Sequence, residues 1–195
     1  MQLGDIAQIK TGLVLSRKKA EMGFDARAKY KLLSVKNIDS DGMFVDETFD
    51  EFISNEILEE HYFTEESDIV MRLSQPYTAI YIDKKHAGLL IPSYFAIIKV
   101  EEPQAVPQYV AWYLNTLNVK KELERAQAGS RIPSTNQQTL KNVSIMLPSI
   151  SKQRRLIELY QLHQREKQLC RKLIEEKEMY FQGIIQRILG GKEND

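Results

Sequence analysis

Arginine, lysine and amide side chains are concentrated in three segments of this sequence. The first contains Arg17, Lys18, Lys19, Lys36 and Asn37, the second Arg72, Gln75 and Tyr77, and the third, residues 130–138, Arg131, Asn136 and Gln137. Lysine and arginine neutralise phosphates, whereas arginine, asparagine and glutamine can form bidentate hydrogen bonds with purine edges. These side chains are therefore candidates for contacts with nucleic acid, with the basic residues of the first segment on phosphates and the remaining residues near bases. A loop that only caps a helix, or a strand with solvated outward side chains, would have a similar composition.

Residue patterns typical of catalysis or metal binding do not occur. The three histidines, His61, His86 and His163, are far apart in the sequence, and no His-x-x-x-His or Cys-x-x-Cys pattern is present. There is no Gly-x-Ser-x-Gly elbow and no glycine-rich nucleotide loop. The acidic residues at 46–68 have no lysine among them, which favours a solvated acidic surface over a magnesium-dependent nuclease. We expect a protein that is not an enzyme and needs no cofactor or metal.

Charge is unevenly distributed although the net charge is zero. Residues 1–40 carry eight Lys or Arg against four acids, and residues 41–70 carry eleven acids and no Lys or Arg. Phosphate neutralisation supplies most non-specific affinity for nucleic acid, so a neutral chain needs a local basic face or a partner protein to bind it. No apolar run reaches the roughly 18 residues that span a bilayer, and no export signal or disulfide pair is present, which favours a cytoplasmic protein.

The first 148 residues have the pattern of a mixed, strand-rich α+β domain. The expected strands lie at 30–36, 69–73, 78–82, 87–91, 94–100 and 143–147. Helical periodicity replaces the alternating pattern between Pro103 and Gln127. The three polar segments fall at the ends of these elements or between them, where loops carry most binding residues.

A long helix is expected at 149–189, followed by a polar tail at 190–195. At 1.5 Å per residue, about 40 residues form a rod of roughly 60 Å, whose apolar stripe a domain of this size cannot cover completely. An imperfect heptad pattern identifies the candidate dimerisation residues, which are Leu159, Leu162, Leu169, Leu173, Tyr180 and Ile184. Glu166 and Glu176 interrupt this pattern, which favours a short antiparallel pairing over a long parallel coiled coil. The alternative is a helix that folds back on its own domain.

The order of several motifs resembles that of the DNA specificity subunits of type I restriction–modification systems. The matching segments are Leu3–Gly12, Ser67–Arg72, Tyr109–Asn115, Gly129-Ser130 with Ile132 and Leu140, Leu147–Ile150 and Gln153–Ile157. Two positions depart from the family pattern: Ser67 replaces a usual glycine, and Lys152 stands where glutamate is preferred before Gln153. The family's usual chain has two recognition domains and two spacer helices, whereas this chain resembles one half of it.

The resemblance implies a target recognition domain that reads one half of a split site in double-stranded DNA. The spacer helix would pair antiparallel with that of a second copy, and the two-fold dimer would read an inverted repeat. Methyltransferase and restriction subunits would supply the chemistry. A protein-interaction adaptor that no longer reads DNA remains the alternative, favoured by the acidic segment and the zero net charge. An enzyme with an unrecognised site is a third reading.

Overall fold

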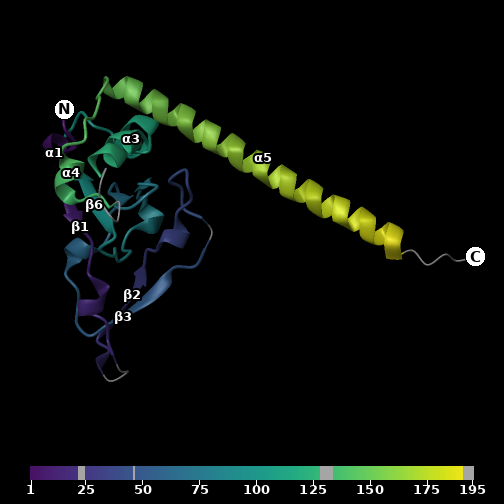
Figure 1. The fold of residues 1–195 in the computed structure, drawn as a ribbon, viewed down its shortest axis with the longest axis horizontal. Coiled ribbons are helices and arrows are strands. Elements are labelled where there is room, and N and C mark those ends of the chain that lie inside the picture. The colour runs from purple at the N-terminus through teal and green to yellow at the C-terminus, as the bar shows by residue number, and fades with distance from the viewer. Residues whose placement is uncertain (22–24, 46, 128–133, 191–195) are drawn as a thin grey trace, which may run out of the picture. The chain divides into compact units, whose positions relative to one another are not determined.

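The computed structural model describes residues 1–21, 25–45, 47–127 and 134–190. Its contacts divide the chain into two units, Met1–Arg154 and Arg155–Asp195. The first unit is the head, which contains all the strands among these residues (Figure 1). The second is the greater part of one helix, α5, which spans Ile150–Gly190 and has 41 residues. The predicted mixed α+β domain and long C-terminal helix are therefore confirmed.

A four-stranded antiparallel sheet forms the centre of the head. Its strands, in spatial order, are β1 (Ala7–Thr11), β6 (Phe95–Val100), β4 (Ile69–Arg72) and β5 (Ala79–Tyr81). The two central strands are buried on both faces, because consecutive residues of each are inaccessible to solvent. Apolar side chains of these strands pack with those of neighbouring loops, and the members of this core are Leu33, Val70, Ile80, Ile82, Leu89, Ile91, Phe95 and Ile97.

Four short helices complete the described part of the head. They are α1 (Leu3–Ile6), α2 (Pro107–Leu114), α3 (Leu117–Ala126) and α4 (Gln137–Lys141). Three of them, all except α3, pack on the sheet. Helix α2 packs on β4 and β5, and α1 and α4 pack on β1. Pro107 occupies the first turn of α2, where its missing N–H costs no helical hydrogen bond.

The helical region expected between Pro103 and Gln127 is divided into α2 and α3 at Asn115. The Asn115 side chain accepts a hydrogen bond from the Ala79 N–H (3.0 Å) and donates one to the Ala79 carbonyl (2.6 Å). Strand β5 is at the edge of the sheet, so this amide occupies the place of a neighbouring strand's peptide group. Helix α2 therefore ends at Asn115, whose side chain pairs with Ala79, 36 positions earlier in the sequence.

We expect Asn115→Ala to lower the free energy of unfolding by about 2–4 kcal/mol, because it leaves the N–H and C=O of buried Ala79 without partners. Asn118→Ala is the matched control, since Asn118 is exposed on α3, and should change stability by less than about 0.5 kcal/mol. Urea denaturation followed by the fluorescence of Trp112, the only tryptophan, measures both. Equal stability of the two variants would contradict the pairing role of Asn115.

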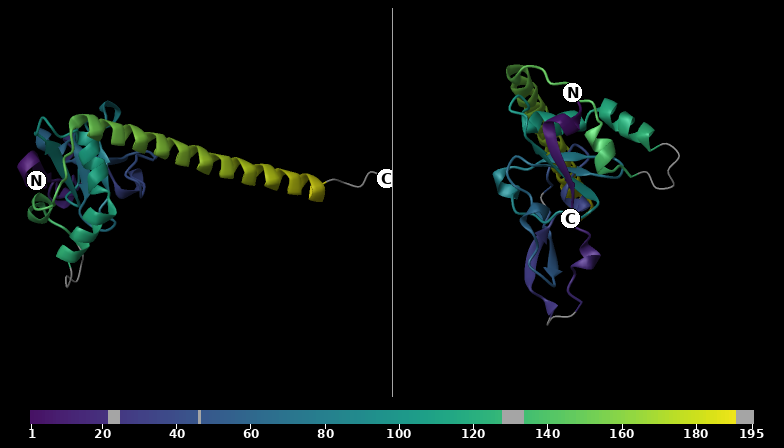
Figure 2. Two further views of the ribbon diagram at one scale, coloured as in Figure 1. Left: turned by 90° about the horizontal axis from the view of Figure 1, so that it is seen from above. Right: turned by 90° about the vertical axis from the view of Figure 1, so that its left-hand side faces the viewer.

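A second, two-stranded sheet forms a smaller lobe of the head. Strands β2 (Ala28–Leu32) and β3 (Asp50–Ser54) pair antiparallel, and they lie below the central sheet in Figure 1 and in the right-hand view of Figure 2. The lobe is joined to the rest of the head through Leu90, which forms isolated bridges with Leu32 and Phe63. The expected strand at 87–91 is thus reduced to bridging residues.

Two other expected strands are also shorter than predicted. The strand expected at 30–36 ends at Leu32. The 3-10 turn η3 (Val35–Asn37) follows, because the Asn37 side chain accepts hydrogen bonds from the backbone and the hydroxyl of Ser34. At 143–147, only the bridge between Ser144 and Gln2 remains. Local side-chain bonds compete with strand formation at such positions.

Gln153, in the first turn of α5, anchors the start of the helix within the head unit. Its side chain is fully buried; it accepts from the Val106 N–H (2.9 Å) and donates to the carbonyls of Gln104 (2.7 Å) and Pro148 (2.8 Å). Lys152, one of the two positions that depart from the family pattern, is exposed. The contacts at the helix start therefore depend on the glutamine.

Candidate nucleic-acid interface

The first polar segment is positioned by a close backbone approach at Gly12. A Cβ atom at Gly12 would lie 2.3 Å from the carbonyl oxygens of both Ile91 and Pro92, so only glycine fits there. Immediately afterwards, the Leu13 N–H bonds to the Ile91 carbonyl (2.7 Å). The 3-10 turn η1 (Leu15–Arg17) follows. Arg17 is thus held close to the central sheet by backbone contacts rather than by its own side chain.

The basic residues of this segment differ in their partners. Lys18 forms an ion pair with Glu56 (2.6 Å) and Lys36 with Asp50 (2.5 Å), and the bond from Lys36 holds the pKa of Asp50 below its usual value. Arg17 and Lys19 are exposed and have no acidic partner among the residues that the structure describes. Exposed ion pairs contribute about 0–1 kcal/mol, so phosphates could replace these carboxylates at little cost.

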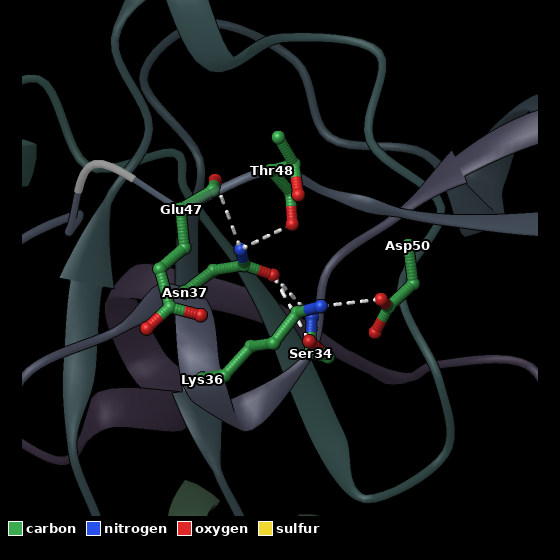
Figure 3. Close-up of polar contacts among 6 residues, drawn as sticks. All are labelled: Ser34, Lys36, Asn37, Glu47, Thr48 and Asp50. Carbon is green, nitrogen blue, oxygen red and sulfur yellow. Dashed lines mark hydrogen bonds and ion pairs between the residues drawn. The ribbon is translucent and has the colours of Figure 1, made fainter.

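Asn37 does not reach the surface, and the prediction that it lies near bases is wrong. Its side chain is 0% exposed. The amide oxygen accepts from the N–H and hydroxyl of Ser34, both at 3.0 Å, and the amide nitrogen faces the carbonyls of Glu47 and Thr48 at 3.4 Å (Figure 3). Asn37 therefore fixes η3 to the chain that leads into β3, and it leaves the adjacent Lys36 at the surface.

The second segment begins at the end of β4 and provides two accessible side chains. Arg72 is half-buried, and its Nε donates to the Ser74 hydroxyl (3.0 Å), which leaves the terminal nitrogens of the guanidinium for other acceptors. Gln75 is exposed, with its amide nitrogen 3.5 Å from a Glu124 carboxylate oxygen. Both residues keep hydrogen-bonding groups that a base could meet.

Tyr77, by contrast, is 0% exposed, so the prediction that it contacts bases is also wrong. Its φ of 53° places it in the left-handed region and directs the ring into the head. Burial raises the pKa of its hydroxyl, as does the nearby carboxylate of Glu124. That hydroxyl has no hydrogen-bond partner among the described residues. Tyr77 thus packs the turn that presents Gln75.

The third segment lies beside the second. Ser134 forms a β-bridge with Ser74, and the Thr135 N–H bonds to the Leu73 carbonyl (2.7 Å). Arg131 falls within 128–133, outside the described residues. Asn136 caps α4, because its side-chain oxygen accepts from the Thr139 N–H (2.9 Å). The structure therefore brings together two polar segments that are about 60 residues apart in the sequence.

Two pockets connect parts of these segments. One, of about 220 Å³, lies between the Val35–Ser40 turn and the Arg72 region, with Ile38, Pro76 and Phe95 among its lining residues. The other, of about 370 Å³, places Arg17 and Lys18 opposite Gln137, whose amide nitrogen donates to the Ile9 carbonyl. Lys10 and His61 also line the second pocket. No sequence pattern points to Lys10 or His61, because only the fold places them next to Arg17.

The six predicted dimerisation residues occur on helix α5. Their exposed fractions are 65% for Leu159, 70% for Leu162, 53% for Leu169, 52% for Leu173, 72% for Tyr180 and 36% for Ile184. Large apolar side chains that remain this exposed are typical of surfaces that bind a partner. Their pairing with a second helix stays a prediction.

Two other features bear on the kind of site. Across the described ranges, no group of three or more His, Cys, Asp or Glu side chains is arranged to hold a metal ion. Within the same ranges, no helix combines the length and the hydropathy that crossing a bilayer requires.

Comparison with known proteins identifies the family. A sequence model described as "Type I restriction modification DNA specificity domain" matches residues 1–176. No match to a curated protein was found. The HsdS subunit of Thermoanaerobacter tengcongensis has a similar structure, with a TM-score of 0.67 and 16% identity, over 100% of this chain and 50% of that one.

Two further solved structures have the same fold. One is described in terms of the complex assembly and conformational transition of the type I R-M system, with a TM-score of 0.70 and 16% identity, over 97% of this chain and 47% of that one. The S subunit of the M. genitalium type I system has a TM-score of 0.52 and 17% identity, over 97% and 43%. The chain thus spans about half the length of these proteins. It belongs to the type I restriction–modification DNA specificity family, whose members recognise DNA and do not catalyse.

Proposed function

We propose that this chain is the DNA-recognition subunit of a type I restriction–modification complex and that its head reads one half of a bipartite site. The observation that carries this proposal is the pairing of Ser74 with Ser134, since it joins the segment of Arg72 and Gln75 to the segment of Asn136 and Gln137. Side chains from these two segments can then meet adjacent bases in one groove.

The proposed contacts divide by chemistry. Arg17, Lys18, Lys19 and Lys36 contact phosphates, whereas Arg72, Gln75, Arg131, Asn136 and Gln137 lie near bases. Asn37 and Tyr77 are omitted because both are buried. Asn136 and Gln137 have one side-chain group each engaged within the protein, so each has a single remaining group for DNA.

The second half of the site requires a second head. Because the matched proteins are about twice as long, a dimer of this chain would have a comparable number of recognition domains and helices. In our proposal, α5 pairs antiparallel with the α5 of a second copy, and the dimer reads an inverted repeat. Methyltransferase and restriction subunits dock on this dimer in the cytoplasm and supply the methylation and cleavage chemistry.

We expect Arg72→Ala and Gln75→Ala to relax target preference, because each removes a side chain capable of a bidentate base contact, worth about 1–3 kcal/mol of discrimination. Sequencing of methylated sites in cells that carry each variant measures the change. Gln8→Ala is the control, since Gln8 is an exposed glutamine outside the three segments. Unchanged specificity in both variants would exclude these residues from base reading.

The adaptor alternative rests on the ion pairs that neutralise Lys18 and Lys36. If the chain were only an adaptor, its complex with the methyltransferase subunit would show no affinity for mixed-sequence DNA that depends on this chain. A DNA-recognition subunit would instead confer affinity that falls steeply as salt increases. Titration of the complex with DNA across salt concentrations therefore distinguishes the two functions.

A further inference from the structure

The 370 Å³ pocket lies where four parts of the head meet. These are the end of β1, the turn η1, the 3-10 turn η4 (Glu60–Tyr62) and the start of α4. The side chains used below are Lys10, Arg17, Lys18, His61, Tyr62 and Gln137. Three of them, Lys10, His61 and Tyr62, lie outside the polar segments assigned to DNA above.

The walls of this pocket are fixed by backbone contacts. Gly12 packs against the carbonyls of Ile91 and Pro92, and the Ile91 N–H bonds to the Tyr62 carbonyl (2.9 Å), which ties η4 to the same strand-like segment. On the opposite side, the amide nitrogen of Gln137 donates to the Ile9 carbonyl. Because these contacts do not depend on a ligand, the pocket is formed before anything binds in it.

The charges around the pocket favour an anion. Lys10 and Arg17 are exposed and, within the described part of the chain, have no acidic partner. Lys18 is paired with Glu56, and His61 lies 3.2 Å from Glu59. None of the residues that line the pocket is acidic. Two cations therefore face a concave site with no carboxylate on its walls, an arrangement that strengthens their attraction for a negative group.

We propose that this pocket binds one phosphate of the DNA backbone, with Lys10 and Arg17 as its charged partners, and that it sets the register of the head on the duplex. The proposal rests on the DNA-recognition function. Unlike non-specific binding by a basic surface, this proposal assigns one phosphate to one preformed site and includes Lys10 among its ligands.

The position of the pocket along the chain explains why a phosphate bound there would set the register of the head on the duplex. Gln137 lines the pocket, and Ser134, three residues earlier, is bridged to Ser74 beside Gln75. Three residues span at most about 10 Å, which is close to the roughly 12 Å width of the major groove. One phosphate at the groove edge and the bases within the groove could thus be contacted by a single short segment. Phosphate contacts of this kind position a protein without carrying sequence information.

The test measures the salt dependence of DNA binding by the full chain with its methyltransferase subunit. The variants are Lys10→Gln and Arg17→Gln, with Arg17→Lys to retain the charge and Lys84→Gln as an exposed cation outside the pocket. Each Gln variant should weaken binding to target and mismatched DNA equally, by about tenfold. Each should also reduce the slope of log affinity against log salt by about 0.9. Arg17→Lys and Lys84→Gln should keep the wild-type slope.

The outcomes separate this inference from the function on which it depends. If the wild-type complex gains no salt-dependent affinity from this chain, the recognition function and the pocket assignment both fail. If the wild type binds and both Gln variants keep its slope, only the pocket assignment fails. A change in the ratio of target to mismatched affinity would also overturn it, because that would indicate base reading. Inorganic phosphate alone, followed by NMR shifts at Gly12, should bind only at millimolar concentrations; micromolar binding would assign the pocket to a free anion instead.

Discussion

Replacing both Leu169 and Leu173 by glutamate should dissociate the proposed dimer into monomers. The molar mass in solution should fall from twice 22.6 kDa to 22.6 kDa. The two leucines are about half exposed on α5, and full burial of one leucine side chain stabilises an interface by about 1.5–3 kcal/mol. Because each leucine is already about half buried, pairing adds only about half of that amount, and the four side chains of a two-fold pair together contribute about 3–6 kcal/mol. Their loss removes a large part of the roughly 8 kcal/mol that holds a micromolar dimer together.

The control adds the same charge elsewhere on the helix. Gln161→Glu with Gln168→Glu introduces two carboxylates at exposed polar positions of α5 and should leave the dimer intact. Light scattering gives the mass of each variant. DNA with two inverted half-sites should bind the leucine variant no more tightly than DNA with one. A leucine variant that keeps the dimeric mass would show that this part of α5 is not the interface.

Gln153→Leu should lower the free energy of unfolding by about 2–4 kcal/mol. The leucine fills the buried site but leaves the Val106 N–H and the carbonyls of Gln104 and Pro148 without the hydrogen bonds that the glutamine makes. Gln153→Glu should be at least as destabilising, because a carboxylate accepts from Val106 but cannot donate to the two carbonyls. Urea denaturation followed by Trp112 fluorescence reports on the head directly.

Lys152→Ala is the matched control for this position. Lys152 is adjacent and exposed, so its truncation should change stability by less than about 0.5 kcal/mol. Stability of Gln153→Leu equal to that of the wild type would mean that the start of α5 does not depend on these three bonds. If Lys152→Ala lost as much stability as Gln153→Leu, Gln153 would not be the residue that anchors the start of α5.

Much of the fold follows from local sequence patterns. The apolar runs at 69–73, 78–82 and 94–100 predict β4, β5 and β6, and the lack of proline after Pro148 predicts α5. The division of the 103–127 region was not predictable from periodicity, because it depends on the pairing of Asn115 with the distant Ala79. Long-range contacts of this kind override local propensity.

The candidate site was predictable only in part, because contacts between distant segments decide which of its side chains are exposed. Residue type alone could not distinguish Asn37 and Tyr77, which are buried, from Gln75, which is exposed. Burial is decided by the packing of β4 and η3 with their neighbours, not by polarity. Likewise Lys10 and His61 become part of a pocket only when β1 and η4 are brought together. Composition indicated the three polar segments, and the fold decides which of their side chains are accessible to a ligand.

The joint between Ser74 and Ser134 is made by main-chain atoms, and so is the bond from Thr135 to Leu73. Replacement of the exposed Gln75 side chain, next to the linkage, therefore leaves the linkage itself unaltered. New target preferences could accumulate during evolution by exchange of such side chains while the framework beneath stays intact.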